Sequence, residues 1–251
     1  MELLIITITG SCIGSFLHML QTQFIATSPY IQSFKTIGCR RSYCSTCQHQ
    51  LKSWQLIPLF SWIWLQGRCY YCQATIPRSH LYFELIFSCL FAFGHLWFPD
   101  CQSLIIFLLL SCWFCLLALY DIKFFLLPDY LTLTLLTTGV LISYTDYGIL
   151  TVEQAIINSS LLFISLSILA YLFYYHQGYA GLGFGDIKLS AALGCWFKFE
   201  QLPLIFIISS LLALIYFAII WYNKRKTFIK IPFGPFLLFG AWSVLIYNYP
   251  R

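Results

Sequence analysis

Two kinds of residue in this sequence are typical of sites that do chemistry: paired cysteines, and aspartates that border apolar runs. Cys44 and Cys47 form one C-x2-C pair and Cys69 and Cys72 form a second, with 21 residues between the two pairs. Each pair can close a tight turn that offers two sulfurs to one tetrahedral ion. The spacing therefore predicts a structural zinc site with four cysteine ligands. The alternative is four free thiols in a loop too short to build its own core.

A third pair, Cys112 and Cys115, has the same spacing but a different setting. It lies in the middle of an apolar run with no partner pair beside it. Small, soft side chains of this kind pack well between helices. We therefore predict a packing role for these two cysteines and no metal.

Asp121 ends an apolar run, and Asp186 follows a glycine-rich stretch, residues 181–185. Carboxylates at membrane depth are costly, so each one is a candidate site residue. Two neighbouring carboxylates share a proton, so that one accepts a proton from water while the other donates to a carbonyl oxygen. This is aspartic protease chemistry and needs no metal. The alternative is a helix cap or an ion pair, because Lys123 and Lys188 each lie two residues from an aspartate.

Asp129 calls for a different interpretation. It follows Pro128 and precedes the apolar run 130–146, which is the position of a helix N-cap. We therefore predict a structural role for Asp129.

The elements that position these residues are membrane helices. With 60% hydrophobic residues, 9% charged residues and a mean hydropathy of +0.78, the composition is far from that of a soluble domain. A helix needs about 20 apolar residues to cross a bilayer. Eight segments approach that requirement, at residues 3–20, 81–98, 102–120, 130–146, 155–175, 187–199, 203–222 and 231–248. The predicted fold is an all-α polytopic membrane protein of about eight helices, in which segment 187–199 is short for a full crossing.

The distribution of charge predicts the orientation of these helices. The gap 21–80 carries six lysines and arginines and no acidic residue, so it is predicted to be cytoplasmic. Both termini then face outward, and Asp121 and Asp186 reach the same cytoplasmic depth, although 65 positions separate them. The net charge of +5 follows from this orientation and from anionic lipid headgroups, so nucleic acid is not an expected partner.

The predicted organisation has three parts. Residues 1–20 form a first transmembrane helix, residues 21–80 a cytoplasmic zinc-knuckle loop, and residues 81–251 a transmembrane core that carries the aspartates. The loop contains tryptophans and a proline that favour an ordered structure.

A series of motifs, in order along nearly the whole chain, resembles the bacterial type IV prepilin peptidases, which are prepilin leader peptidases and N-methyltransferases of the aspartic intramembrane peptidase family A24. Besides the two cysteine pairs, the series comprises Gly14-Ser15-Phe16-Leu17, Ile57-Pro58-Leu59, Ser61-Trp62, Gly67-Arg68-Cys69, Glu84-Leu85, Asp121 with Leu127-Pro128-Asp129, Gly183-Phe184-Gly185-Asp186-Ile187-Lys188-Leu189, and Pro232-Phe233-Gly234-Pro235-Phe236.

The resemblance implies that Asp121 and Asp186 are the catalytic pair of an endopeptidase in the bacterial inner membrane, with the active site facing the cytoplasm. Its implied substrates are the precursors of type IV pilins or pseudopilins, cut after a glycine that ends a short basic leader. Members of the family commonly also methylate the new N-terminus with S-adenosylmethionine. For that second activity Gly67, Arg68 and Glu84 are the candidate cofactor-binding residues.

The chain departs from the family pattern at three places. His18 stands where the family usually has asparagine, and the Arg-Leu-Pro segment that usually follows soon afterwards is missing. After Cys72, Arg78-Ser79-His80 stands in place of the usual Arg-Tyr-Pro. None of these departures touches the aspartates, so they bear on methyl transfer and leader recognition.

Other functions remain open from the sequence. One is a peptidase whose zinc loop is purely structural, without methyl transfer. Another, of a different class, is a membrane transporter that uses its carboxylates as a proton relay, which predicts inverted repeats that the sequence does not show. A general intramembrane protease of the presenilin type shares the G-x-G-D motif, but the zinc loop argues against it.

Overall fold

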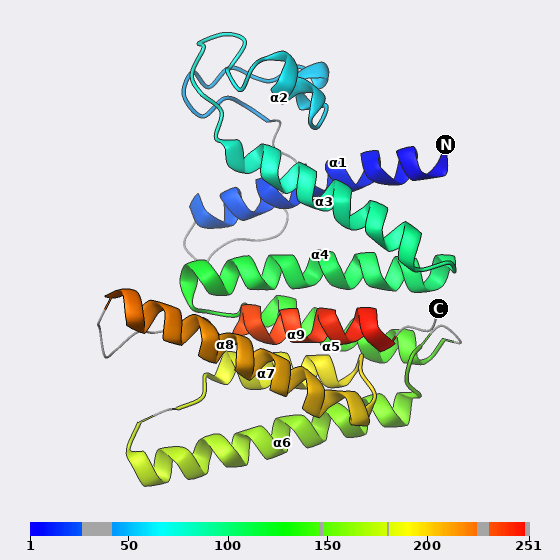
Figure 1. Ribbon diagram of the computed structural model, residues 1–251, viewed down its shortest axis with the longest axis vertical. Helices are drawn as coiled ribbons and strands as arrows, with labels where there is room; N and C mark the ends of the chain where they lie inside the picture. The colour runs from blue at the N-terminus through cyan, green and yellow to red at the C-terminus, as the bar shows by residue number, and fades with distance from the viewer. Residues whose placement is uncertain (27–41, 146–147, 180, 225–230, 249–251) are drawn as a thin grey trace. The chain divides into compact units, whose positions relative to one another are not determined.

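The computed structural model describes residues 1–26, 42–145, 148–179, 181–224 and 231–248 (Figure 1). Over these residues the chain forms helices and turns, with two isolated β-bridges and no strand. The helices are α1 (Glu2–Ala26), η2 (Ser53–Leu56), α2 (Phe60–Trp64), α3 (Arg78–Trp97), α4 (Cys101–Phe124), α5 (Asp129–Ser143), α6 (Val152–Gln177), α7 (Phe184–Gly194), η3 (Phe199–Gln201), α8 (Leu202–Lys224) and α9 (Gly234–Asn248). The all-α part of the predicted fold is confirmed.

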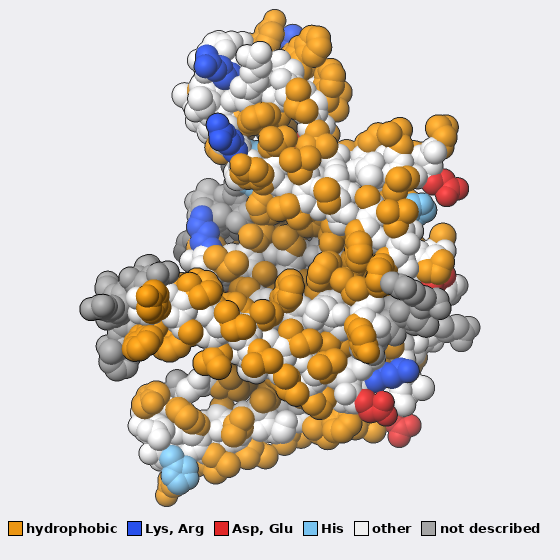
Figure 2. Space-filling model, viewed as in Figure 1, with side chains coloured by type: hydrophobic (Ala, Val, Ile, Leu, Met, Phe, Trp, Pro, Cys, Tyr) orange, Lys and Arg blue, Asp and Glu red, His pale blue; other side chains and the backbone are white. Residues whose placement is uncertain are grey.

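Five stretches of the described chain are long and apolar enough to cross a bilayer: Glu2–Leu20, Arg78–Trp97, Cys101–Phe124, Val152–Gln177 and Phe199–Tyr222. Helices α5 and α9 are apolar but shorter, and α7 has 11 residues. The chain is thus a multi-pass membrane protein, and eight crossings stay a prediction. Large apolar side chains on α6 and α8 are exposed, and Figure 2 shows hydrophobic side chains spread along both helices. A bilayer is the solvent that such faces require.

Several basic residues behind the predicted orientation, including Lys35, Arg40 and Arg41, lie outside the described residues, as does Asp146. The orientation therefore depends on the sequence pattern.

The chain divides into two compact units, residues 1–108 and residues 109–250, and each is described by itself. In the first unit α1 packs along α3 (Figure 1). A Cβ atom on Gly10 would lie 2.6 Å from the carbonyl oxygen of Phe87, and one on Gly14 would lie 2.7 Å from that of Phe83. The two glycines, four residues apart, therefore let the helix backbones approach closely, as small residues do between membrane helices.

The second unit is built around α7. This short helix is buried along most of its length, and it contacts α5, α6 and α9. Trp196, just beyond its end, donates a hydrogen bond to the carbonyl oxygen of Leu135 at 3.0 Å. A Cβ on Gly194 would lie 2.9 Å from the backbone nitrogen of Ser159 on α6. The segment predicted at 187–199 is therefore a buried helix that begins at Phe184, which explains why it is shorter than a bilayer crossing.

Candidate active site and metal centre

Asp121 lies in the last turn of α4 and is 6% exposed. Its Oδ2 atom accepts a hydrogen bond from the backbone N–H of Gly234, the first residue of α9, at 2.9 Å. The N–H groups of a first helical turn have no partner within their own helix, and they favour a negative charge. The N-terminus of α9 thus offsets the unfavourable position of the Asp121 carboxylate at the C-terminal end of α4.

Asp186 lies in the first turn of α7, outside the five candidate spans. Burial, and after it the charge of Asp121, raises the pKa of Asp186 to about 7. The second cause requires that the two carboxylates interact electrostatically. The two aspartates that the sequence singled out, 65 positions apart, are therefore near enough to interact electrostatically.

The loop between α4 and α5 reaches the start of α7. Phe125 has a positive φ of 52°, which turns the chain sharply after α4. Leu127 then packs against Gly185, where an added Cβ would lie 3.3 Å from the Leu127 Cβ atom. Gly185 thus allows the close approach that its type predicted.

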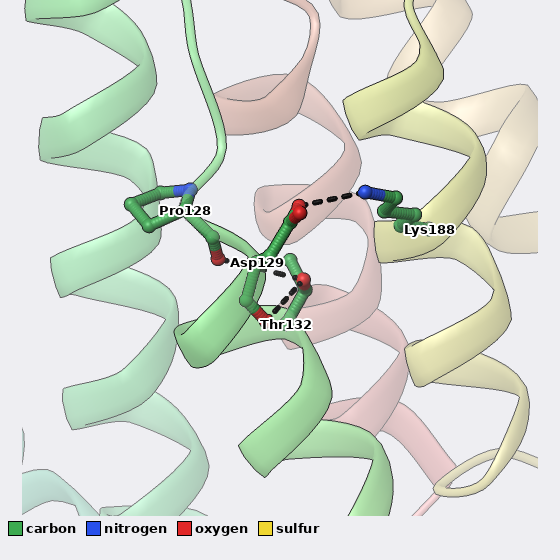
Figure 3. A network of polar contacts seen from close by, with 4 residues as sticks. All are labelled: Pro128, Asp129, Thr132 and Lys188. Carbon is green, nitrogen blue, oxygen red and sulfur yellow. Dashed lines mark hydrogen bonds and ion pairs between the residues drawn. The ribbon is translucent and has the colours of Figure 1, made fainter. Parts of the chain in front are cut away.

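Asp129 is not the N-cap residue that the sequence predicted. Pro128 occupies the N-cap position of α5 without a capping hydrogen bond from its side chain, and Asp129 is the first helical residue. Its Oδ1 atom forms an ion pair with the Lys188 ammonium at 2.7 Å (Figure 3). The N-cap prediction is therefore wrong, because Pro128, whose ring fixes its φ, provides the extended residue just before the helix, and Asp129 is already helical. The ion-pair alternative does hold for Lys188, although its partner is Asp129 and not Asp186.

Gly234 is a site residue that sequence reasoning missed. Besides donating its N–H group to Asp121, it leaves no room for a side chain, because a Cβ there would lie 2.7 Å from Asp121 Oδ2. The sequence feature that could have pointed to Gly234 is its place between two prolines, Pro232-Phe233-Gly234-Pro235, at the start of an apolar helix. Nothing local connects that motif with a carboxylate 113 positions earlier.

The four paired cysteines come together as their spacing predicted. The sulfurs of Cys44, Cys47, Cys69 and Cys72 all lie within 4.8 Å of one another, and those of Cys44 and Cys72 are 3.9 Å apart. Four sulfurs at such distances surround a point where a tetrahedral metal ion fits. The arrangement could hold a metal ion.

Each cysteine pair closes the same kind of turn. Cys44 donates its N–H to His49 and accepts from Gln48, and Cys69 donates to Ala74 and accepts from Gln73. Both glutamines have φ of 57°, the left-handed conformation that such turns need. The repeated geometry explains how two separate pairs present their sulfurs in the same way.

Backbone N–H groups near the first pair favour a thiolate. Hydrogen bonds from Cys47 and then Thr46 lower the pKa of Cys44 to about 6. For Cys72 the Ala74 N–H lowers the pKa, but burial and the neighbouring thiols outweigh it and raise the pKa to about 11. Four crowded thiols cannot all ionise cheaply without a cation, so metal binding would release protons.

Gly67, Arg68 and Glu84 shape the cysteine loop. Gly67 has a left-handed φ of 68° and lies against the Trp62 ring, and Arg68 forms an isolated bridge with Thr75. Glu84, on α3, is buried and accepts the N–H of Leu59 at 2.7 Å. Leu59 has φ of 61°, so this hydrogen bond holds a sharp turn ahead of α2.

These three residues do not form one ligand cluster. Within the described chain no hydrogen bond or ion pair joins Glu84 to Gly67 or Arg68. Their contacts fit a structural role in the loop, and cofactor binding by them stays a prediction.

Two of the departures from the family pattern, His18 and Arg78-Ser79-His80, lie next to each other in the structure. His18 Nε2 and Ser79 Oγ are 3.1 Å apart, and the rings of His18 and His80 lie with their centroids 4.0 Å apart and their planes tilted by 52°. His18 is 5% exposed. His18 on α1 and Ser79 on α3 are 61 positions apart in the sequence, and both differ from the family pattern. In the structure they are neighbours.

Comparison with known proteins covers most of the chain. Residues 8–98 match the bacterial peptidase A24 N-terminal domain, and residues 108–218 match the type IV leader peptidase family. A prepilin leader peptidase/N-methyltransferase from Aeromonas salmonicida (strain A449) is 34% identical over 209 residues, which are 83% of this chain and 72% of that protein. No solved structure matches the chain.

Two further relatives give the same result. A type 4 prepilin-like proteins leader peptide-processing enzyme from Escherichia coli O78:H11 is 32% identical over 250 residues, 95% of this chain and 91% of that protein. A prepilin leader peptidase/N-methyltransferase from Pectobacterium carotovorum is 36% identical over 210 residues, 82% of this chain and 74% of the relative. With the motifs, the carboxylate pair and these matches in agreement, the chain belongs to the type IV leader peptidase family.

Proposed function

We propose that this protein cleaves the short basic leader of type IV prepilins or pseudopilins after a glycine, at the cytoplasmic face of the bacterial inner membrane. Asp121 and Asp186 are the catalytic residues of this proposal. The observation that carries it is the electrostatic interaction between the buried carboxylate of Asp121 on α4 and the half-buried carboxylate of Asp186 on α7. A pair of carboxylates in which one keeps its proton near neutral pH is what an aspartic peptidase requires.

The surroundings of the two carboxylates suggest a division of roles. Asp121 accepts the Gly234 N–H, which stabilises its ionised form, so Asp121 is proposed as the base. Asp186, with its raised pKa, is proposed as the acid. Asp121 takes a proton from water as the water oxygen bonds to the scissile carbonyl carbon, and Asp186 gives its proton to the carbonyl oxygen. The C–N bond then breaks as Asp121 gives its proton to the leaving nitrogen, and Asp186 takes a proton from one hydroxyl of the intermediate as the C=O bond re-forms.

The direct test is cleavage of a pseudopilin precursor in membranes that contain this protein. The expected product is shortened by the leader, with its N-terminus directly after the glycine. A matched precursor in which that glycine is replaced by a bulky residue is expected to stay uncut. If the intact precursor is not shortened while the protein is present and folded, the proposed function is wrong.

Gly234→Ala is expected to lower the cleavage rate by about 10²-fold. The added methyl group would overlap Asp121 Oδ2, and displacing a catalytic group by about 1 Å costs about this factor. The rate should be measured on protein whose folded amount is matched to wild type.

Gly178→Asn is the control for this prediction. Gly178 ends α6 in the left-handed conformation, and a Cβ there meets nothing within 4 Å. Asparagine tolerates that conformation, so cleavage should stay near the wild-type rate. Equal activity of the Gly234 and Gly178 variants would contradict the role given to Gly234.

For the second activity, we infer that the new N-terminus is methylated with S-adenosylmethionine, as the names of the relatives from Aeromonas and Pectobacterium include N-methyltransferase. Gly67, Arg68 and Glu84 remain the proposed cofactor residues. Their contacts fit the loop itself, so no step of methyl transfer is derived through them.

A comparison of Glu84 variants separates the two roles of that residue. If Glu84 only holds the Leu59 turn, Glu84→Gln keeps the accepting oxygen and retains most methyl incorporation, whereas Glu84→Ala loses it. If Glu84 binds the cofactor by its charge, both variants lose methyl transfer. Labelled methyl incorporation into cleaved pseudopilin distinguishes these outcomes, and unchanged transfer in all variants would exclude both roles.

The loop that carries the four paired cysteines has a structural role in this proposal. We infer that its four sulfurs hold a structural zinc ion, since four thiolates are a typical zinc set and a loop on the reducing cytoplasmic side does not form disulfides. The proposed organisation remains a first helix at residues 1–20, the zinc loop at 21–80 and the peptidase core at 81–251.

A further inference from the structure

The loop that carries the cysteines presents an exposed apolar face. Phe60, Ile63 and Trp64 lie at positions i, i+3 and i+4 of α2, so they share one side of this short helix. All three are exposed, Ile63 to 65% and Trp64 to 70%, and the rings of Phe60 and Trp64 stack with centroids 5.7 Å apart. Leu56 and Ile57, just before α2, are exposed as well, and Figure 2 shows hydrophobic side chains gathered over this part of the loop. We call these five residues the α2 face.

The interior of the loop uses another side of α2. The ring of Trp62 lies against Gly67, where an added Cβ would be 2.8 Å from the ring. Gly67 and Cys69 are buried beside it in sequence, whereas Ile63 and Trp64 point outward. The α2 face is therefore not needed for the packing of the loop itself.

A hydrogen bond fixes the depth at which α2 begins. Leu59, the residue before α2, donates its N–H to the buried carboxylate of Glu84 at 2.7 Å. Glu84 lies six residues after the start of α3 at Arg78, which is about 9 Å along the helix axis. Because α3 is long and apolar enough to cross a bilayer, this level belongs to the boundary of the membrane. Helices that lie in that boundary bury their apolar face by about 5–10 Å.

The charges around the α2 face complement a phospholipid surface. Residues 42–77 contain Lys52 and Arg68, both exposed, and no acidic residue, and the exposed Arg78 follows at the start of α3. Basic side chains near a bilayer are attracted to anionic headgroups, and tryptophan is typical of the headgroup level. The basic leader of a precursor would instead be repelled by these residues. Lipid is thus the partner that fits both the apolar and the charged side chains.

We propose that the α2 face docks on the membrane. Its side chains enter the boundary between headgroups and acyl chains in the leaflet next to the N-terminus of α3, and Lys52 and Arg68 contact anionic headgroups. The cysteine loop is then held flat against the bilayer instead of standing free in water. This inference does not depend on the proposed peptidase function, because lipid contact can be measured without a substrate.

The test is photo-crosslinking of the full chain in vesicles of phosphatidylcholine and phosphatidylglycerol. The photoreactive residue p-benzoyl-phenylalanine replaces Trp64 in one variant and Phe60 in another. Both positions are exposed and aromatic, so the fold tolerates either replacement. After illumination, mass spectrometry identifies the molecule joined to each position, and phospholipid adducts are expected at both. In vesicles of phosphatidylcholine alone the yield should fall, because Lys52 and Arg68 then have no anionic headgroup to contact.

Two further positions serve as controls. Ile86 is 61% exposed on α3, within a candidate membrane span, and the photoreactive residue there is expected to join phospholipid. Ser45 is exposed in the turn of the first cysteine pair, where residues 45–50 include no large apolar side chain. The same residue at position 45 is expected to give no lipid adduct.

Four results would contradict the proposal. Lipid adducts at Ile86 but at neither Phe60 nor Trp64 would show that the α2 face lies away from the bilayer. A covalent dimer formed through these two positions would make the face an interface between two copies of the chain. Equal lipid yields at Ser45 and Trp64 would show that the whole loop touches lipid without docking through α2. Equal yields in the two kinds of vesicle would remove the part given to Lys52 and Arg68.

Discussion

Replacing Asp121 or Asp186 with asparagine is expected to reduce prepilin cleavage by about 10²–10⁴-fold, the range that a positioned acid or base contributes. Asparagine at 121 still offers an oxygen to the Gly234 N–H, so the local geometry survives while the base is lost. Asparagine at 186 replaces a carboxyl whose pKa of about 7 already makes it partly neutral, so the fold is undisturbed and only the transferable proton disappears. Cleavage of a precursor in membranes, with expression checked, measures both effects.

Glu153→Gln is the matched control, because it removes a carboxylate that is exposed in the first turn of α6. It should cleave like wild type. Asp186→Glu adds a further comparison: a proton relay tolerates the longer acid, whereas a peptidase that needs the carboxyl at a fixed place does not. If both asparagine variants still cut at the wild-type rate, the aspartic mechanism is wrong and the transporter interpretation takes its place.

Replacing Cys69 with serine is expected to reduce bound zinc from about one ion per chain to nearly none. Cys69 is 4% exposed, so its sulfur lies inside the loop and no other cysteine can take its place without refolding the turn. Small modules of this kind depend on their metal for folding. Metal analysis of the purified protein gives the stoichiometry, and limited proteolysis within residues 42–77 should become faster.

Cys112→Ser is the control for the metal prediction, since Cys112 has the same C-x2-C spacing with Cys115 but lies within α4. It should retain the ion. Unchanged zinc in Cys69→Ser would contradict the four-cysteine site, and loss of zinc in Cys112→Ser as well would show that metal loss follows from general unfolding.

Sequence reasoning could link distant residues where the chemistry of a residue type requires a particular partner. Cys44, Cys47, Cys69 and Cys72 had to converge to serve one ion, and their sulfurs do lie together. Asp121 and Asp186 were linked because helix ends at the same predicted depth can meet. In both cases residue type limited the possible partners to a few.

Other contacts join residues whose types do not specify a partner. The Gly234 N–H beside Asp121, the Asp129–Lys188 ion pair and the contact of His18 with Ser79 join residues 113, 59 and 61 positions apart. A glycine, an exposed lysine or a lone histidine has many possible partners, so local pattern cannot choose among them. The N-cap assigned to Asp129 was wrong by one residue, because Pro128 takes that position, and nothing near Asp129 in the sequence pointed to its distant partner Lys188.

Hydropathy, cysteine spacing and ordered motifs are local properties, so the amino-acid sequence is enough to identify an all-helical membrane protein of the type IV leader peptidase family. The folded chain was needed to find the backbone group that supports Asp121, the acid that pairs with Lys188, and the short buried helix α7. These depend on how helices pack against one another, and packing is decided by the shapes of surfaces brought together from distant parts of the chain.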